Sequence, residues 1–259
     1  FLASFPFEDT LDQVSAWNNI SEDLSANSPM DRLLCGDVGF GKTELAIRAA
    51  FRVVVAGKRV VVLSPTTILA NQLRSSFSAR LEPGAISVDM VSRFRSQKDL
   101  GVVKNNIIEN NNDVLIGTHA VLNDDLYLKN IGLLIVDEEH RFGVKHKERI
   151  RQFKSSVDVL SMSATPIPRS MNLALSGIYS VSMLQTPPRL RLPIITQVEY
   201  YNDLTIMAAV GFEVGRGGQV YFVHNDILSI KNITHKLQGL FSKHAVRFIH
   251  GQEPPKEIE

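Results

Sequence analysis

A glycine-rich stretch near the N-terminus holds the residues best suited to chemistry, Gly36-Asp37-Val38-Gly39-Phe40-Gly41-Lys42-Thr43. An apolar run precedes this stretch, and apolar residues at helical spacing follow it, so the predicted order is strand, glycine loop and helix. Glycines permit a tight turn whose N–H groups point inward, and the helix N-terminus adds partial positive charge. The stretch therefore predicts a phosphate cradle, in which Lys42 reaches the β- and γ-phosphates and Thr43 offers its hydroxyl to Mg²⁺.

A run of acidic residues supplies a partner for this cradle. Asp137-Glu138-Glu139-His140 follows the apolar run 133–136, and open α/β sheets bind ligands at the carboxyl ends of their strands. Asp137 would hold Mg²⁺ through water, and Glu138 would orient or deprotonate the water that attacks the γ-phosphate. A solvated acidic loop is the alternative. His140 joins the candidate catalytic residues through its place in this run, although an isolated histidine is more often a satisfied polar residue.

Composition limits the class of protein. The 259 residues are 44% hydrophobic and 21% charged, which is ordinary globular composition and enough length for one large or two small domains. The net charge of +1 gives no global positive field, so a DNA partner would need local basic stretches. The single cysteine, Cys35, excludes an internal disulfide and is predicted to be a buried apolar filler. Without a membrane-length apolar run or a signal pattern, the protein is expected to be soluble and cytoplasmic.

The elements that must position these residues form an alternating pattern. A helix is predicted from a polar cap at Asp9 or Thr10 to about Ser21. After the glycine loop, helical patterns alternate with short apolar runs at 60–63, 86–90, 113–116, 133–136 and 159–162. Such runs are typical of parallel strands covered by helices on both faces. Residues 1–185 are therefore predicted to be a three-layer α/β unit.

The remaining residues predict a second, incomplete unit. Residues 186–193 contain three prolines and are interpreted as a linker. Beyond them we expect strands at 194–200, 218–223 and 246–249 and helices at 204–214 and 227–240. These elements are too few for a second domain of the same size.

The two polar stretches together resemble motifs I and II of the superfamily 2 DExH helicases and translocases, and further stretches match that class in order. Phe5-Pro6 with Thr10 and Gln13 resembles the Q motif, in which Gln13 would read the adenine edge. Ser64-Pro65-Thr66-Thr67 resembles motif Ia, Gly117-Thr118-His119 motif Ib, and Ser163-Ala164-Thr165 motif III. The resemblance implies a RecA-like P-loop NTPase sheet flanked by helices and followed by part of a second RecA-like lobe. It also implies that motifs Ia and Ib touch the nucleic-acid backbone and that motif III links nucleotide to DNA.

A narrower resemblance involves residues 137–144 together with Ala164-Thr165-Pro166-Ile167-Pro168-Arg169. These are similar to the branch that contains the transcription-repair coupling factors and the fork-reversing helicase RecG. Phe40, Glu139 and the segment 91–96 favour the coupling factors, whereas 161–164 fits RecG equally well. The resemblance implies an ATP-driven motor on double-stranded DNA, with RNA polymerase and repair proteins contacted by modules outside these residues. The alternatives are a RecG-type helicase on branched DNA and an ATP-dependent switch without motor activity.

The candidate DNA contacts can also be argued from residue types. A motor that moves along any sequence needs hydroxyls, N–H groups and arginines for phosphate, not base-reading side chains. Thr66, Thr67, Thr118 and His119 lie just after predicted strands, and Arg93 and Arg95 flank an aromatic residue. Structural roles remain open, since the threonines could cap a helix and the arginines could form a solvated face.

One departure from the family pattern bears on activity. The family's arginine fingers lie in motifs V and VI, and this sequence ends before them. An arginine finger can contribute a factor of ~10³ to 10⁵ in rate. The resemblance therefore implies that these residues bind nucleotide but hydrolyse it poorly by themselves.

Overall fold

The fold is taken from a computed structural model, which describes residues 1, 4–91, 97–109, 111–123, 125–164, 180–189 and 194–253. The chain divides into two compact units, Phe1–Leu192 and Pro193–Glu259. Each unit is described by itself below.

The first unit is built on a seven-stranded sheet in the order β3-β4-β2-β5-β6-β1-β7. In that order the strands span Val88–Val91, Val114–Gly117, Arg59–Leu63, Ile131–Asp137, Asp158–Ser163, Asp31–Gly36 and Ser180–Leu184. All neighbouring strands pair in parallel, so their carboxyl ends meet at one edge of the sheet. The segments that follow β1, β2, β4 and β5 therefore gather along this edge.

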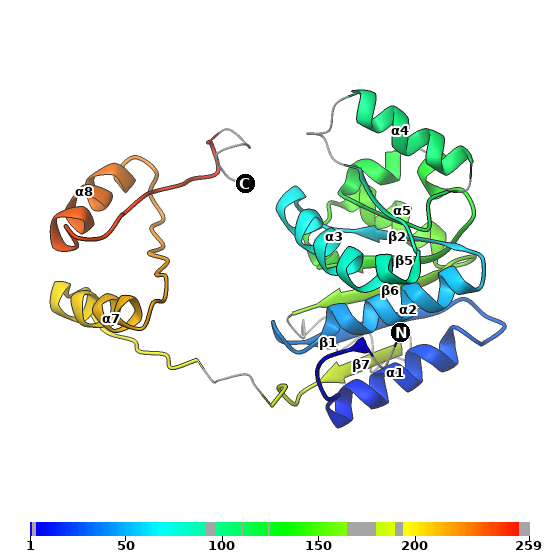
Figure 1. The fold of residues 1–259 in the computed structure, drawn as a ribbon, viewed down its shortest axis with the longest axis horizontal. Coiled ribbons are helices and arrows are strands. Elements are labelled where there is room, and N and C mark those ends of the chain that lie inside the picture. The colour runs from blue at the N-terminus through cyan, green and yellow to red at the C-terminus, as the bar shows by residue number, and fades with distance from the viewer. Residues whose placement is uncertain are drawn as a thin grey trace. The chain divides into compact units, whose positions relative to one another are not determined.

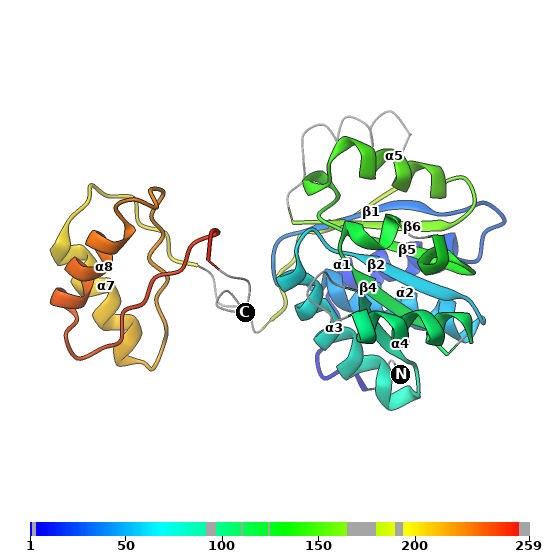
Figure 2. The same cartoon turned by 90° about the horizontal axis from the view of Figure 1, so that it is seen from above.

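Helices cover both faces of this sheet, because its central strands have apolar side chains on both. Val60 and Val62 of β2 belong to one buried cluster with α1 (Leu11–Asp23), α2 (Lys42–Val55) and α3 (Thr67–Leu81). Val61 and Leu63 belong to a second cluster with α4 (Gln97–Ile108) and α5 (Val144–Phe153). Figure 2 shows the sheet between α2 and α5. The predicted three-layer α/β architecture is confirmed.

Several boundaries differ from the sequence prediction. Helix α1 ends at Asp23 rather than near Ser21, whereas its cap, Thr10, is one of the two predicted residues. Strand β3 begins at Val88, two residues later than predicted, because Ser87 is held by the Asp113 carboxylate. The edge strand β7 was absent from the prediction, and α1 lies beside it (Figure 1). Short 3₁₀ helices, which the sequence pattern did not reveal, occupy Glu82–Gly84, His119–Asn123, Asp125–Leu128 and Glu139–Arg141.

Within residues 194–253 the second unit contains two helices, α7 (Asp203–Gly215) and α8 (Ile230–Leu240). Both were predicted, although α8 begins three residues later than expected. The strands predicted at 194–200, 218–223 and 246–249 are wrong, since no residue within 194–253 belongs to a strand. A strand requires a neighbour that takes up its N–H and C=O groups, and these segments have none. Their apolar side chains stay open to solvent, with Ile195 88% and Tyr221 90% exposed.

The helices of the described residues share one further property. None of them is both long enough and apolar enough to cross a lipid bilayer. The longest, α3, has 15 residues and carries Arg74 and Arg80.

Candidate functional site

The glycine loop connects the end of β1 at Gly36 with the start of α2 at Lys42, as its sequence predicts. Gly39 and Gly41 adopt φ angles of 81° and 84°. Side chains at these positions would be strained, because left-handed φ angles favour glycine. A Cβ atom at Gly41 would also collide with the side-chain amide of Gln13. Both glycines are therefore needed for the shape of the loop.

The loop keeps several donors available. The N–H of Val38 donates to Asp37 Oδ1 at 2.7 Å, and that of Phe40 donates to the Asp37 carbonyl at 3.2 Å. No acceptor among the described residues takes up the N–H groups of Gly39, Lys42 or Thr43. Donors at a helix start are the usual partners of an anion, since the helix dipole adds to their charge.

Lys42 is held inside the loop by two carbonyl groups. Its Nζ donates to the Gly36 oxygen at 2.5 Å and to the Asp37 oxygen at 3.0 Å. Burial lowers the pKa of Lys42, while the negative charges of Glu138 and Asp137 act in the opposite direction. Lys42 and the acidic run thus lie close enough to interact, which is the juxtaposition that the sequence predicts.

Asp137 is the last residue of β5 and lies at the carboxyl edge of the sheet. Its surroundings raise its pKa from 3.8 to about 6, first through burial and second through the neighbouring Glu138 charge. The positive charges of Lys42 and Arg141 only partly oppose this. The nearby cations therefore do not offset the cost of burying an ionised Asp137 beside Glu138.

Glu138 has a left-handed backbone, with φ at 50°, and its N–H donates to the Met162 carbonyl at 2.9 Å. Its carboxylate accepts from the N–H of Ala164 at 3.0 Å and from Ser163 Oγ at 3.5 Å. The Nδ1 atom of His140 lies 3.2 Å from the same carboxylate. Left-handed backbone in a glutamate is strained, and such strain is concentrated at functional sites. Of the predicted coupling residues, Thr165 lies outside the described residues.

Ser161 is a contact that sequence reasoning missed. It lies on β6 two residues before Ser163, so both hydroxyls project from the same face of the sheet. Ser161 Oγ donates to Glu139 Oε2 at 2.7 Å. Strand β6 thus gives one hydroxyl to each glutamate of the acidic run. The alternation of serine in 161–163 was the only available signal.

The predicted Q-motif residues lie beside the glycine loop. Gln13 and Thr10 form a reciprocal capping box at the start of α1. The side-chain amide of Gln13 also donates to the Phe40 carbonyl at 3.0 Å, and the residue is only 4% exposed. Gln13 therefore connects α1 directly to the loop.

Phe5 is placed by a charged cluster that sequence reasoning also missed. The guanidinium groups of Arg48 and Arg80 lie 5.0 and 5.5 Å from its ring. Glu44 accepts from both arginines, at 3.0 and 2.8 Å. A paired cluster of this kind fixes an otherwise irregular N-terminal segment against α2 and α3.

The candidate DNA-binding residues lie after β2 and β4. Thr66 is exposed but caps α3 by accepting from the Leu69 N–H at 3.3 Å, and Thr67 begins that helix. Thr118 is buried, and the His119 ring packs 4.7 Å from that of His146. The hydroxyls of Ser64 and Thr118 have no hydrogen-bond partner in the described part of the chain. Arg93 and Arg95 lie outside the described residues.

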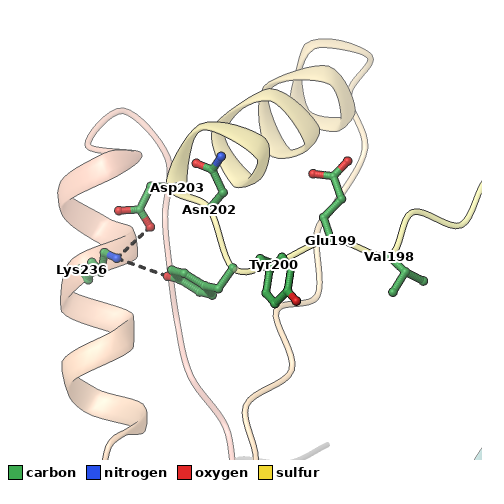
Figure 3. Close-up of a pocket in the computed structure, with 7 residues that line it drawn as sticks. Val198, Glu199, Tyr200, Asn202, Asp203 and Lys236 are labelled. Carbon is green, nitrogen blue, oxygen red and sulfur yellow. Dashed lines mark hydrogen bonds and ion pairs between the residues drawn. The ribbon is translucent and has the colours of Figure 1, made fainter.

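A separate open hollow in the second unit is lined by Val198, Glu199, Tyr200, Tyr201, Asn202, Asp203 and Lys236 (Figure 3). Lys236 Nζ donates to Asp203 Oδ1 at 2.8 Å and to the Tyr201 hydroxyl at 3.4 Å. None of the predicted site residues lines this hollow. The predicted site residues that the structure describes therefore all lie in the first unit.

Comparison with known sequences decides the family, because the profile of the DEAD/DEAH box helicases matches residues 10–173. The chain belongs to the DEAD/DEAH box helicase family. Members of this family bind nucleotide, and the matched region contains the glycine loop and the acidic run. The profile thus covers most of the first unit.

Similar proteins narrow the comparison within the DEAD/DEAH box helicases. The transcription-repair-coupling factors of Haemophilus influenzae and Bacillus subtilis are 46% and 42% identical over all 259 residues. The chain spans only 23% and 22% of the lengths of these relatives. A solved structure of RecG bound to a three-way DNA junction is 34% identical with a TM-score of 0.77, covering 93% of this chain and 32% of RecG. Identity is thus higher to these coupling factors than to that RecG structure.

Proposed function

We propose that this chain is the ATP-binding part of a double-stranded DNA translocase, working in the cytoplasm within a transcription-coupled repair factor that displaces stalled RNA polymerase. The observation that carries the proposal is the meeting of Lys42, Asp137 and Glu138 at one sheet edge. The identity to transcription-repair-coupling factors over the whole chain supports this biological role over that of RecG. RNA polymerase and repair proteins would be contacted by residues outside this chain.

The glycine loop is the proposed triphosphate site, formed by residues 36–43. The N–H groups of Gly39, Lys42 and Thr43 would donate to phosphate oxygens, and Lys42 would exchange its carbonyl partners for the β- and γ-phosphates. That exchange suits Lys42, because its present acceptors are neutral and burial favours a charged partner. Asp37, Val38 and Phe40 would shape the loop around the phosphates.

Thr43 and Asp137 are the proposed Mg²⁺ ligands. A bound cation would offset the burial and the Glu138 charge that raise the pKa of Asp137. No group of three His, Cys, Asp or Glu side chains within the described ranges is arranged to hold a metal alone. Mg²⁺ commonly takes one or two protein ligands and completes its shell with water and phosphate oxygens. When bound, the ion would neutralise charge on the transferred phosphoryl group.

Glu138 is the proposed base that orients the attacking water. Its carboxylate is fixed by Ala164, Ser163 and His140, so its direction depends on the end of β6. Ser163, Ala164 and Thr165 are the proposed link between the nucleotide and the DNA side. Since the Ala164 N–H is a direct partner of Glu138, any shift of this segment would change the position of the base.

Adenine recognition is assigned to Phe5 and Gln13. The Phe5 ring is held beside two guanidinium groups, which gives it a fixed plane for a purine to stack upon. Gln13 donates once and accepts once within the protein, and an amide side chain retains a further donor and acceptor. Those remaining groups would read the base edge.

DNA is proposed to run past the ends of β2 and β4. Thr66, Thr67, Thr118 and His119 lie there. Arg93 and Arg95, which lie outside the described residues, are assigned from residue type alone. The partnerless hydroxyls of Ser64 and Thr118 support this path, because buried polar groups normally have partners and a phosphate could provide one after a small movement. Contacts of this type are independent of base sequence.

The experiment that tests the proposal measures ATP turnover with and without duplex DNA, in this chain and in the full-length protein. Duplex DNA should stimulate turnover in the full-length protein. Glu138→Gln should keep ATP binding but lower turnover by at least about a hundredfold, the usual contribution of a positioned base. Lys42→Ala should lose binding, whereas Lys243→Ala, an exposed lysine of the second unit, should behave like the parent.

Two outcomes would contradict the proposal. Turnover that is insensitive to DNA would favour the alternative of a nucleotide-dependent switch. Stimulation by branched junctions but not by plain duplex would favour the RecG-type alternative. Both measurements use the same coupled ATPase assay with matched DNA concentrations.

A further inference from the structure

Asp12 makes a contact that the proposed chemistry does not use. It lies in the first turn of α1, and its Oδ2 atom accepts from the N–H groups of Gln185 and Thr186, at 2.8 and 2.7 Å. These hydrogen bonds lower the pKa of Asp12. Gln185 and Thr186 follow β7 directly, so the contact holds the chain just after it leaves the sheet on its way to the second unit.

The chain that leaves β7 also lies next to the glycine loop. Leu184, the last residue of β7, pairs in register with Gly36 at the end of β1. A Cβ atom at Gly36 would lie only 2.8 Å from the Leu184 Cβ, so the two backbones meet closely. An exposed ion pair of 2.9 Å between Arg189 and Glu8 also joins the chain after β7 to the residues that precede α1.

Asp12 and Gln13 are consecutive residues that face different partners. Gln13 holds the Phe40 carbonyl of the glycine loop, and Asp12 holds the N–H groups after β7. Because one helical turn carries both side chains, a displacement of the loop that moves Gln13 must also move the Asp12 carboxylate. The first turn of α1 is thus a short rigid connection between the two segments.

We propose that Asp12 is a positioning residue that couples the occupancy of the glycine loop to the start of the connection between the two units. The inference rests on the proposed nucleotide site. Nucleotide would order the loop and, through Gln13 and Asp12, tighten the chain after β7. This fixes where the connection between the two units begins.

Amide hydrogen exchange of this 259-residue chain tests the coupling directly. Asp12→Ala should speed exchange at Gln185 and Thr186 by about tenfold, because each amide loses a charged acceptor. Asp12→Asn keeps one acceptor oxygen and should restore part of the protection. Glu22→Ala removes an exposed carboxylate from the other end of the same helix and should change neither amide. In the parent, ATP with Mg²⁺ should slow exchange at both amides, and Asp12→Ala should abolish this response.

A second readout belongs to the full-length protein. Asp12→Ala should lower DNA-stimulated turnover by about fivefold, the scale of exposed charge-assisted contacts, with unchanged nucleotide affinity. Equal exchange at Gln185 and Thr186 in Asp12→Ala and Glu22→Ala would overturn the inference. So would exchange in the parent that ignores bound nucleotide. A parent that binds no ATP would instead overturn the proposed function, which separates the two failures. If Asp12→Ala also lowers protection within α1, Asp12→Asn replaces it in the comparison with Glu22→Ala. Faster exchange at Gln185 and Thr186 in Asp12→Asn than in Glu22→Ala then supports the inference, and equal exchange overturns it.

Discussion

Asp137 should set the pH range of the site, because its pKa is raised from 3.8 to about 6 by burial and by the charge of Glu138. The neutral form is thus favoured in the folded chain, and the stability it provides is present below pH 3.8 and lost as pH rises through about 6. Asp137→Asn keeps a neutral side chain at every pH. Its gain in unfolding free energy over the parent should therefore grow between about pH 4 and about pH 6 and then level off.

Urea titrations of the two proteins at several pH values measure this difference. Asp158→Asn is a useful control, because burial also raises the pKa of Asp158. This residue begins β6, whereas Asp137 pairs with Met162 near the other end of that strand, so Asp158 lies away from the proposed site. In the parent, affinity for ATP with Mg²⁺ should fall below about pH 6, because the protonated carboxyl group holds no cation. A pH-independent gain in Asp137→Asn would show that the pKa of Asp137 is not raised in the folded protein.

Ser161 should matter for turnover more than for binding. Its hydroxyl is the partner of Glu139, and Ser161→Ala leaves that carboxylate with one hydrogen bond fewer in a buried strand environment. We expect a loss of about 1 kcal/mol in stability and a lower rate with little change in ATP affinity. Ser155→Ala, which removes an exposed hydroxyl bonded to Gln152, is the control. Identical rates in both variants would mean that Glu139 needs no support from β6.

The residues of the site differ in how far sequence could predict them. The glycine loop and the acidic run are short local patterns whose order along the chain specifies strand, loop and helix, so the fold around Lys42 and Asp137 could be predicted. Ser161, Asp12 and the Arg48–Glu44–Arg80 cluster act on partners up to 174 positions away. Such pairings depend on which strands and helices become neighbours in the fold. No local sequence pattern specifies the strand order β5-β6-β1-β7.

At the scale of elements, α1 shows how one cap serves both stability and the site. Thr10 accepts from the Gln13 N–H, and the Thr10 N–H donates to the Gln13 side chain. Thr10→Ala removes half of this box and should destabilise the first unit by about 1 kcal/mol. Thr10→Ser keeps a hydroxyl and should restore most of the loss. Thermal denaturation followed by Trp17 fluorescence measures both, and equal melting temperatures for Ala and Ser variants would contradict a capping role.

The strands that could be predicted from sequence are those whose side chains are buried on both faces of the sheet. The central strands carry apolar residues on both faces, a pattern that identifies parallel strands from sequence alone. Strand β7 lies at the edge of the sheet and alternates Ser180 and Ser182 with Val181 and Met183. It therefore lacks the continuous apolar run that identifies the central strands. In the second unit the apolar segments had strand-like composition but no pairing partner. Composition therefore predicted the preference of those segments and not their structure.

At the scale of the whole molecule, the two units should differ in stability, because they bury very different amounts of apolar surface. The first unit contains both large clusters, whereas Leu237 is the one buried apolar side chain among residues 194–253. The only tryptophan, Trp17, packs against the first cluster and reports on the first unit alone. Helices α7 and α8 contribute to circular dichroism but not to that fluorescence signal.

With increasing urea, part of the helical signal should therefore disappear before Trp17 fluorescence changes, and the two transitions should not coincide. ATP with Mg²⁺ should shift only the later transition, since it binds the first unit. Leu237→Ala should shift only the earlier one, by truncating the buried apolar side chain of residues 194–253. Coincident transitions in all three conditions would mean that the units unfold together, and that the second unit draws its stability from contacts with the first.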